Sequence, residues 1–167
     1  MTAATISGPT QLVSAIAEQI LRSLPQWFGV EAALLRYAAE AQILPSFVAL
    51  SAGVPIGFIS LRKHNPDTVE INCIAVVPDR HRSGVGTALC NAASNWWASQ
   101  GGRLLHVKTI GPTRNDSSYA RTRAFYVARG FVRVEEFIEL WPGYPCLLLV
   151  LPLTERHGAR PRGQLST

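Results

Sequence analysis

The chain has 167 residues, 47% of them hydrophobic, and a formal net charge of +5 at pH 7. This length predicts a single domain over residues 1–153, and the lack of a long apolar run or a signal-peptide pattern excludes a membrane partner and favours the cytoplasm. The excess of arginine suits an anionic ligand, but without a long basic run with interleaved aromatic residues it does not indicate nucleic-acid binding.

Two helices are expected in the first part of the chain. Apolar residues recur at helical spacing from Thr10 to Leu24, and Pro25 ends this stretch. A second helix is expected over residues 30–42. Three strands then follow at 47–50, 55–62 and 69–77, separated by turn sequences at 51–53 and 64–67.

The second part of the chain alternates helices with strands. Helices are expected at 84–100 and 119–129, and strands at 104–110, 131–140 and 146–153. This order predicts a mixed α/β sheet with a meander at one end and crossover helices in the middle. Residues 154–167 are polar, basic and poor in apolar side chains, so we expect a disordered tail there.

The most informative segment is the loop between the expected strand 69–77 and the helix that follows it. A loop that opens directly into a helix offers unpaired backbone N–H groups and the positive end of the helix dipole, and both attract anions. Without further signals, an ordinary helix start explains this pattern equally well. The loop consists of His81, Arg82, Ser83, Gly84, Val85, Gly86 and Thr87.

Two common nucleotide-binding patterns do not fit this loop. A dinucleotide fingerprint requires a third glycine where this chain has Leu89, and an acidic residue on the next strand, which residues 104–110 lack. The Gly-Lys-Ser/Thr ending of a nucleoside triphosphate loop is absent as well. The loop therefore suits a pyrophosphate, but not that of NAD or ATP.

The segment from Glu70 to Phe131 resembles the core of the GNAT superfamily of N-acetyltransferases. Residues 81–86 resemble the superfamily loop Gln/Arg-x-x-Gly-x-Gly/Ala, with histidine at the first position. Residues 124–131 (AFYVARGF) resemble its Phe-Tyr-x-x-x-Gly-Phe element. Over residues 47–153 the resemblance implies an α+β fold: a twisted, mostly antiparallel sheet of six or seven strands with splayed central strands, flanked by about four helices.

The resemblance also implies a cofactor and its binding residues. Acetyl-CoA would be the co-substrate, with its pyrophosphate on the N–H groups of residues 82–87. The pantetheine arm would lie beside the end of the third strand, where two neighbouring strands splay and expose backbone groups. The strand residues implied in this contact are Ile74, Ala75 and Val76.

Two residues are implied in proton transfer. Some members of the superfamily use a glutamate at the position of Glu70 to accept the amine proton through water, although a solvated charge at a strand end explains Glu70 as well. Alternation along the strand would place Glu70 and Asn72 on one face, opposite Ile71, Cys73 and Ala75. Tyr126 matches the superfamily tyrosine that protonates the departing thiolate, with a normal pKa near 10. The alternative for Tyr126 is a packed helix aromatic.

Other polar and aromatic residues have less specific interpretations. The three cysteines and four histidines show no ligand spacing, so we expect buried thiols, no acyl carrier and no metal. Asp116 is expected to cap the helix that follows it. Arg121 and Arg123 suit either a phosphate contact or solvent exposure. Plausible walls of an acceptor site are aromatic (Trp27, Phe28, Tyr37, Trp141 and Tyr144), with glutamates at 135, 136 and 139.

These observations predict an acetyl-CoA-dependent N-acetyltransferase in which an amine attacks the thioester directly in a ternary complex. The acceptor would be a small-molecule or peptide amine, and the chain is compatible with a homodimer. Two alternatives stay open. One is a module that binds acyl-CoA without transferring the acyl group. The other is a protein that binds nucleic acid or phosphate through its arginines, and this one would show steeply salt-dependent binding.

Overall fold

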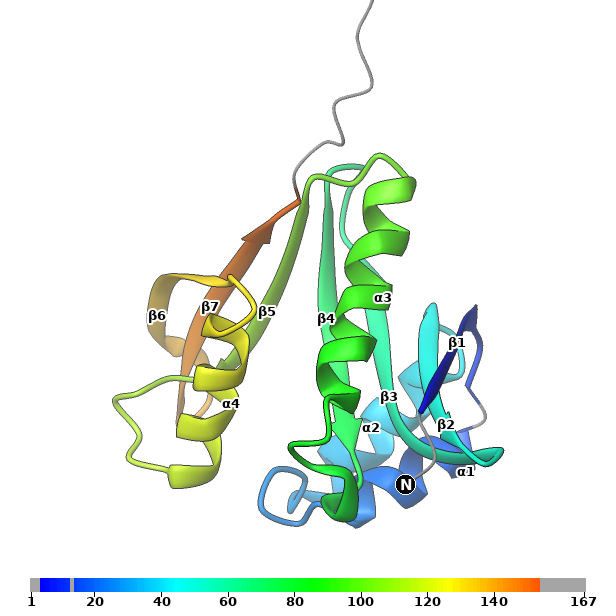
Figure 1. The fold of residues 1–167 in the computed structure, drawn as a ribbon. Coiled ribbons are helices and arrows are strands. Elements are labelled where there is room, and N and C mark those ends of the chain that lie inside the picture. Colours follow the sequence, from blue (N-terminus) through cyan, green and yellow to red (C-terminus); the bar gives the residue numbers. More distant parts are fainter. Residues whose placement is uncertain (1–3, 13, 154–167) are drawn as a thin grey trace, which may run out of the picture.

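The computed structural model describes residues 4–12 and 14–153, and the predicted tail at 154–167 lies outside the described residues. The described chain forms one seven-stranded sheet in the order β1-β2-β3-β4-β5-β7-β6 (Figure 1). All neighbouring strands are antiparallel except β4 and β5, which are parallel. The strands are β1 (Thr5–Thr10), β2 (Ser46–Ser51), β3 (Val54–Lys63), β4 (Thr68–Val76), β5 (Leu104–Ile110), β6 (Val132–Trp141) and β7 (Tyr144–Pro152).

Four α-helices cover the two faces of the sheet. Figure 1 shows α3 and α4 in front of the sheet, and α1 and α2 behind β3 and β4. Each face has its own apolar core, and the larger core lies under α3 and includes Leu89, Trp97 and Leu105. The helices are α1 (Ser14–Arg22), α2 (Glu31–Ala41), α3 (Val85–Ser99) and α4 (Ser117–Val127). None of these described helices is both long and apolar enough to cross a membrane.

The predicted order of elements is confirmed, except that β1 was not expected. The sequence of β1, TISGPT, contains glycine and proline, and almost all of its residues are exposed at the edge of the sheet. It therefore lacks the apolar alternation by which a half-buried strand is recognised. The first helix also starts later than expected, at Ser14 and not at Thr10, because residues up to Thr10 pair with β2.

A bulge in β4 changes the direction in which its side chains point. Leu61 of β3 pairs with Ile71, whereas the adjacent Ser60 pairs with Cys73, so Asn72 is an extra residue on β4. An extra residue moves every following side chain to the opposite face. The prediction that Ile71 and Cys73 share a face is therefore wrong: Ile71 packs in the α3 core, and Cys73 packs against α1 and α2.

Candidate active site

The strands β4 and β5 pair over three residues only and then separate. The pairing covers Thr68 to Glu70 on β4 and Leu104 to His106 on β5. Figure 1 shows the two strands diverging toward the end of β4, while β5 stays beside β7. The rest of β4 thus has β3 on one side and, on the other, an edge whose backbone amides are not used by β5. The predicted splay is confirmed.

The three strand residues expected to contact the cofactor lie on this separated part of β4. Ile74, Ala75 and Val76 pair with β3 on one side. The side chains of Ile74 and Val76 are half-buried against the α3 core, and that of Ala75 packs in the core under α1 and α2. Held in this way, the strand presents a rigid edge to any extended chain that lies between β4 and β5.

The loop after β4 folds back on the end of that strand. A ring nitrogen of His81 lies 2.7 Å from the carbonyl oxygen of Val76, and the hydroxyl of Ser83 donates to the carbonyl of Arg80 at 2.6 Å. Arg82 has a φ of 60° and an exposed side chain. These turns leave the backbone between Arg82 and Gly84 at the surface, just before α3 begins.

Helix α3 starts without a side-chain cap. Its N-cap is Gly84, in the left-handed conformation with a φ of 86°, and no side chain accepts a hydrogen bond from the first turn. The space where a Cβ of Gly84 would lie is open. The N–H groups of Val85, Gly86 and Thr87 therefore belong to a first turn that offers donors and a positive helix end to an anion.

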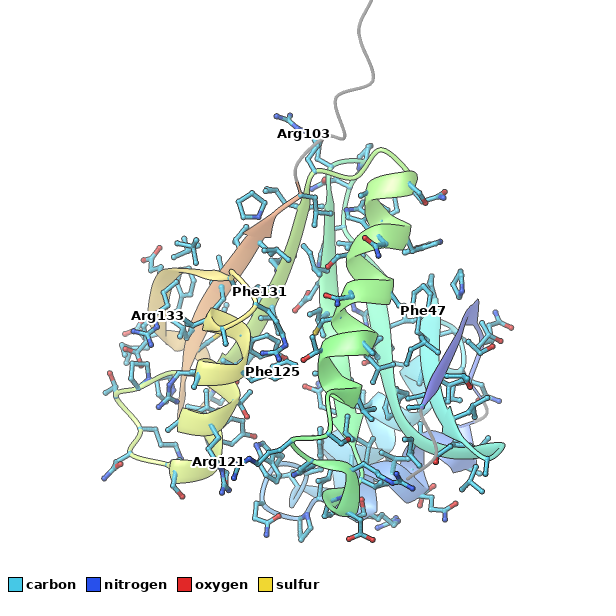
Figure 2. All side chains as sticks on the ribbon, viewed as in Figure 1. Phe47, Arg103, Arg121, Phe125, Phe131 and Arg133 are labelled. Atoms are coloured by element: carbon cyan, nitrogen blue, oxygen red, sulfur yellow. The ribbon has the colours of Figure 1, made fainter. Side chains whose placement is uncertain are left out.

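A contact between α3 and α4 involves the second glycine of the loop and a cation that we did not predict. A Cβ on Gly86 would lie 3.1 Å from the ring of Phe125. The guanidinium of Arg129 lies 3.9 Å from the centre of that ring and donates hydrogen bonds to the hydroxyl of Thr87. Phe125 lies on the side of α4 that faces α3 (Figure 2). Arg129 was missed because it follows α4 and lies far from the loop in sequence.

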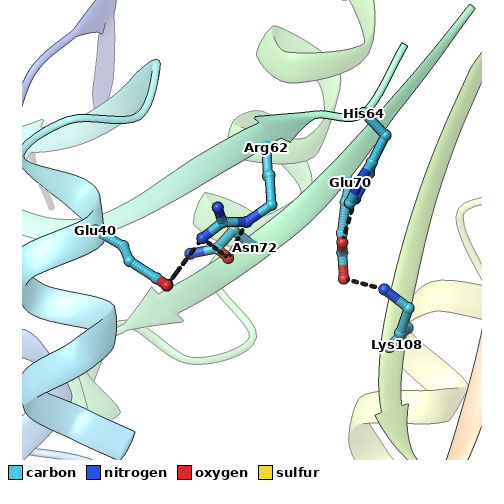
Figure 3. Close-up of polar contacts among 6 residues, drawn as sticks. All are labelled: Glu40, Arg62, His64, Glu70, Asn72 and Lys108. Atoms are coloured by element: carbon cyan, nitrogen blue, oxygen red, sulfur yellow. Dashed lines mark hydrogen bonds and ion pairs between the residues drawn. The ribbon is translucent and has the colours of Figure 1, made fainter.

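Glu70 lies at the point where β4 and β5 separate, in a cluster of basic side chains. Its carboxylate accepts a hydrogen bond from Nζ of Lys108 at 2.9 Å and lies 2.6 Å from Nε2 of His64 (Figure 3). Burial opposes ionisation, but the hydrogen bonds from Lys108 and His64 outweigh it, and together with nearby charges they lower the pKa of Glu70. The carboxylate is thus ionised at neutral pH and only 14% exposed.

The ring of His106 completes this cluster. It lies 5.3 Å from the ring of His64, centre to centre, and its Nδ1 atom is buried without a hydrogen-bond partner among the described residues. Burial lowers the pKa of His106, an effect that the negative charge of Glu70 partly opposes. Sequence spacing did not reveal the cluster, because its members come from the β3–β4 turn, β4 and β5.

A second polar network fixes the bulge of β4 to helix α2. The guanidinium of Arg62 lies 2.8 Å from Glu40 and donates to Oδ1 of Asn72 at 3.2 and 3.3 Å. The side-chain amide of Asn72 donates in turn to Glu40 at 2.9 Å (Figure 3). All three side chains are thus held by one another, which gives Asn72 a structural role at the bulge.

Tyr126 points into the core between α4 and the sheet. It is 3% exposed, and its ring packs edge-on against Phe125 and Phe131 at 5.3 Å each. Burial raises the pKa of Tyr126 well above 10, so the expectation of a normal pKa is wrong. The phenol stays protonated at any ordinary pH, and its raised pKa makes it a weaker acid than an exposed tyrosine. Phe125 and Tyr126 both pack against the α3 core, although they are adjacent on the helix.

Other residues of α4 hold the helix in place. Asp116 caps it, as predicted, by accepting hydrogen bonds from the N–H groups of Ser118 and Tyr119. Arg123 is buried and donates to the carbonyl of Ile110 at 2.8 Å. Neither expectation for Arg123, a phosphate contact or a solvated charge, is therefore met. Arg121 is exposed, which is compatible with both of its interpretations.

The connection between α1 and α2 contacts both sides of the separated strands. The indole N–H of Trp27 donates to the hydroxyl of Thr122 on α4 at 3.0 Å, and its carbonyl accepts from the hydroxyl of Tyr119 at 3.2 Å. Its ring also packs edge-on against His81 of the loop, 5.9 Å between ring centres. Trp27 thereby links α4 to the loop.

The predicted acidic wall lies farther along the chain, on the edge strand β6. A shallow open depression of about 440 Å³ is lined by residues 135–140, which include all three glutamates of that prediction. Glu136 accepts hydrogen bonds from the backbone and the hydroxyl of Thr113 at 3.0 and 2.9 Å. The depression follows β6 itself and does not lie between β4 and β5.

The comparison with protein families gives one match. The model described as the acetyltransferase (GNAT) family matches residues 14–131, which is more than half of the chain and includes the loop, Glu70 and Tyr126. No curated protein matches the chain.

Solved structures share the fold over nearly their whole length. A protein from Desulfovibrio desulfuricans assigned to the GNAT family has a TM-score of 0.78 at 21% identity, covering 91% of this chain and 100% of its own. The ribosomal-protein-S18-alanine N-acetyltransferase from Escherichia coli has a TM-score of 0.73 at 18% identity, covering 97% and 99%. An aminoglycoside 6'-N-acetyltransferase complexed with coenzyme A has a TM-score of 0.70 at 17% identity, covering 94% and 99%. At such identities the likeness establishes the fold and not the substrate.

Proposed function

The chain belongs to the acetyltransferase (GNAT) family and is therefore an acetyltransferase, and from this premise we propose that it transfers the acetyl group of acetyl-CoA directly to a primary amine. The observation that carries the proposal is the continuity of two features along one segment. The separated edge of β4 is followed, after the loop 77–84, by the uncapped start of α3. Coenzyme A has an extended arm with amides that is joined to a pyrophosphate. The amides fit the strand edge and the pyrophosphate fits the helix start, in the same order along the chain.

The cofactor would lie along the segment from Ile74 to Thr87. The pantetheine amides would pair with the backbone of Ile74, Ala75 and Val76. The pyrophosphate would accept hydrogen bonds from the N–H groups between Arg82 and Thr87. The N-cap residue Gly84 has no side chain that would compete for these donors. Arg129, half-buried against Phe125 and bonded to Thr87, adds a positive charge beside this helix start.

Two residues would move protons during the transfer. The amine reaches the thioester as an ammonium ion and must lose a proton, and Glu70, ionised and at the point where the strands separate, would accept it through water. The thiolate that leaves must gain a proton, and the protonated phenol of Tyr126 would supply it. Holding the two substrates in reacting positions is worth about 7–11 kcal/mol, so the shape of the site contributes at least as much as the proton transfers.

Direct transfer is favoured over an acetylated cysteine. The three cysteines of the chain are all free thiols and all buried. Burial raises the pKa of each of them, most clearly for Cys73 and Cys90, and a protonated thiol is a poor nucleophile. A ternary complex of enzyme, acetyl-CoA and amine follows. Free thiols also suit a reducing compartment, and we place the protein in the cytoplasm.

The acceptor would be a small-molecule or peptide amine. The similar structures include enzymes named for a ribosomal-protein alanine and for aminoglycosides, and both are amines of these two classes. Residues 1–153 would act as one catalytic domain. A homodimer is also proposed, because the edge strand β6 exposes a row of apolar side chains. These are Val132, Val134, Ile138 and Leu140.

The first test is thermal unfolding with acetyl-CoA, coenzyme A, NAD and ATP in parallel. A ligand at a hundred times its dissociation constant adds about 2.7 kcal/mol, which corresponds to roughly 5–10 °C in a domain of this size. We expect the two coenzyme A species alone to raise the midpoint. No shift with either of them contradicts the proposal.

The second test separates catalysis from binding. With a panel of amines and a thiol-release assay, Glu70→Gln should lose about 10²–10⁴-fold in kcat while keeping the shift with acetyl-CoA. Glu31→Gln, a surface carboxylate paired with Arg22, is the matched control and should behave as wild type. Binding of acetyl-CoA without turnover on any amine would identify a non-catalytic binding module.

A further inference from the structure

Three side chains that can bind a metal ion meet where β4 and β5 separate. They are His64 on the β3–β4 turn, Glu70 on β4 and His106 on β5. One ligand atom from each of the three lies within 4.8 Å of the other two. The nearest pair, Nε2 of His64 and Oε2 of Glu70, is 2.6 Å apart. This is the one such group of three among the described residues.

Two further observations point to a ligand at this position. The Nδ1 atom of His106 is buried and has no hydrogen-bond partner in the described chain, and a buried polar atom of this kind normally has one. The two histidine rings lie 5.3 Å apart, centre to centre, and are tilted by 32° to each other. One ligand atom of each ring lies within 4.8 Å of the same carboxylate. A cation bound between them would satisfy atoms that the protein itself does not fully pair.

We propose that His64, Glu70 and His106 bind a divalent transition-metal ion of the zinc type. Two imidazoles and one carboxylate form a ligand set that zinc uses in proteins, with the fourth position left to water or a substrate. Donor atoms around one tetrahedral zinc lie roughly 3.3 Å apart, given bonds of about 2.0–2.1 Å. To reach that spacing, the widest pair of ligand atoms, up to 4.8 Å apart, would approach by at most about 1.5 Å, and the His64–Glu70 pair, 2.6 Å apart, would separate by about 0.7 Å. The exposed side chain of His64 is free to make such movements.

Lys108 determines how the carboxylate can take part. Its ammonium group is bonded to Oε1 of Glu70, whereas Oε2 faces His64. Glu70 would therefore bind the ion through Oε2 alone, because Oε1 is already bonded to Lys108. The positive charge of Lys108 opposes that of the ion, so the site should be weaker than it would be without this lysine.

The bound ion would occupy the carboxylate that the proposed function assigns to the amine proton. This consequence rests on the proposed function, whereas binding of the ion does not. An enzyme with the ion bound should transfer acetyl groups more slowly, and removal of the ion by a chelator should restore the rate.

The test is titration of the chelator-treated full-length protein with Co²⁺, without acetyl-CoA, read by visible absorption and by calorimetry. Co²⁺ that is bound by few ligands has strong visible absorption bands, which Co²⁺ in water lacks. Addition of Zn²⁺ should displace the Co²⁺ and remove these bands. We expect one ion per chain. Loss of an outer partner costs about 10–100-fold in metal affinity, and His64→Gln or His106→Gln should cost at least as much.

Two matched variants make the result specific. His81→Gln changes a histidine outside the cluster and should leave Co²⁺ binding as in wild type. Lys108→Met keeps the length of the side chain, removes the opposing charge and should tighten binding. No saturable binding, equal binding by both cluster variants and wild type, or no tightening with Lys108→Met would overturn the proposal. Because acetyl transfer is measured separately, failure here leaves the proposed function standing.

Discussion

Glu70 on β4 and His106 on β5 are the last pair of residues that these two parallel strands share. Toward the start of β4 the sheet is continuous, and beyond this pair β4 and β5 have no further pairing. Glu70 thus lies at the inner end of the gap between the strands. Ile74, the first residue of the proposed cofactor contact, lies four residues farther along this separated edge, and the loop follows at the end of the strand. The proposed proton acceptor and the proposed cofactor contacts are therefore placed by one irregularity of the sheet.

Tyr126→Phe tests the proposed proton donor. Removing the hydroxyl leaves the ring packed against Phe125 and Phe131, so the fold should be retained. The thiolate would then leave without its donor, and kcat should fall by about 10²-fold or more. Steady-state kinetics with the best amine measure this effect, and the thermal shift with coenzyme A should be that of wild type. A kcat equal to wild type would show that Tyr126 is only a packing residue.

Gly84→Ala tests the shape of the loop. A residue with a Cβ in the left-handed region costs about 1–2 kcal/mol, which should lower the midpoint of unfolding by roughly 2–8 °C. Because the same residue leads into α3, the affinity for coenzyme A should fall as well. Gly53→Ala is the matched control, since Gly53 has a φ of 79° and equally open space, but lies in the β2–β3 turn. Equal losses of affinity in both variants would remove the loop from the proposed binding site.

Most of the fold could be predicted from apolar patterning, because α1, α2, α3 and the strands β2 to β5 each bury a stripe or a run of apolar residues. The strand β1 could not, since its residues are exposed and include Gly8 and Pro9, and only pairing with β2 defines it. The bulge at Asn72 was also beyond prediction. Nothing in the local sequence marks an extra residue, yet it reverses the face on which Cys73 and Ala75 lie.

The candidate site was predictable only where it is continuous in sequence. The residues from Ile74 to Thr87 follow one another, and local rules for strand ends and helix starts apply to them. The partners of Glu70 come from other strands, at His64 and Lys108, so no spacing rule relates them. Arg123 shows a different limit of sequence-based prediction. It lies on a polar stretch of helix, and only its hydrogen bond to the carbonyl of Ile110 explains why it is buried.

Asn72→Ala tests the network that holds the bulge. The variant loses the hydrogen bonds to Arg62 and Glu40, and it leaves those two partly exposed charges paired only with each other. Bonds to charged groups are worth more than neutral ones, but exposure reduces them, so we expect a loss of about 1–2 kcal/mol in the free energy of unfolding. Urea denaturation measures it.

The double variant Asn72→Ala with Glu40→Gln is the control for this network. If the three side chains act together, the two losses should not add, because each change already disrupts the shared contacts. Full additivity would show that Asn72 and Glu40 contribute independently, and the bulge would then need another cause.

The buried thiols predict a loss of stability at alkaline pH. Burial raises the pKa of Cys90 to about 12 and raises that of Cys73 further. In the unfolded chain both thiols lose their protons at about pH 8.5. Above that pH the unfolded state binds fewer protons than the folded state, so the free energy of unfolding falls as pH rises. The slope for each thiol approaches about 1.4 kcal/mol per pH unit until the pKa of the folded state is reached.

Urea midpoints at pH 8 and pH 10.5 measure this loss, and Cys90→Ala isolates one thiol. The variant should be less stable than wild type at pH 8, because it leaves a small cavity beside Leu89 and its neighbours in the α3 core. Its stability should nevertheless decline less between the two pH values, since one group that ionises only on unfolding has been removed. An identical decline in both proteins would mean that Cys90 ionises equally in the folded and unfolded states, and its burial would then have no effect on its pKa.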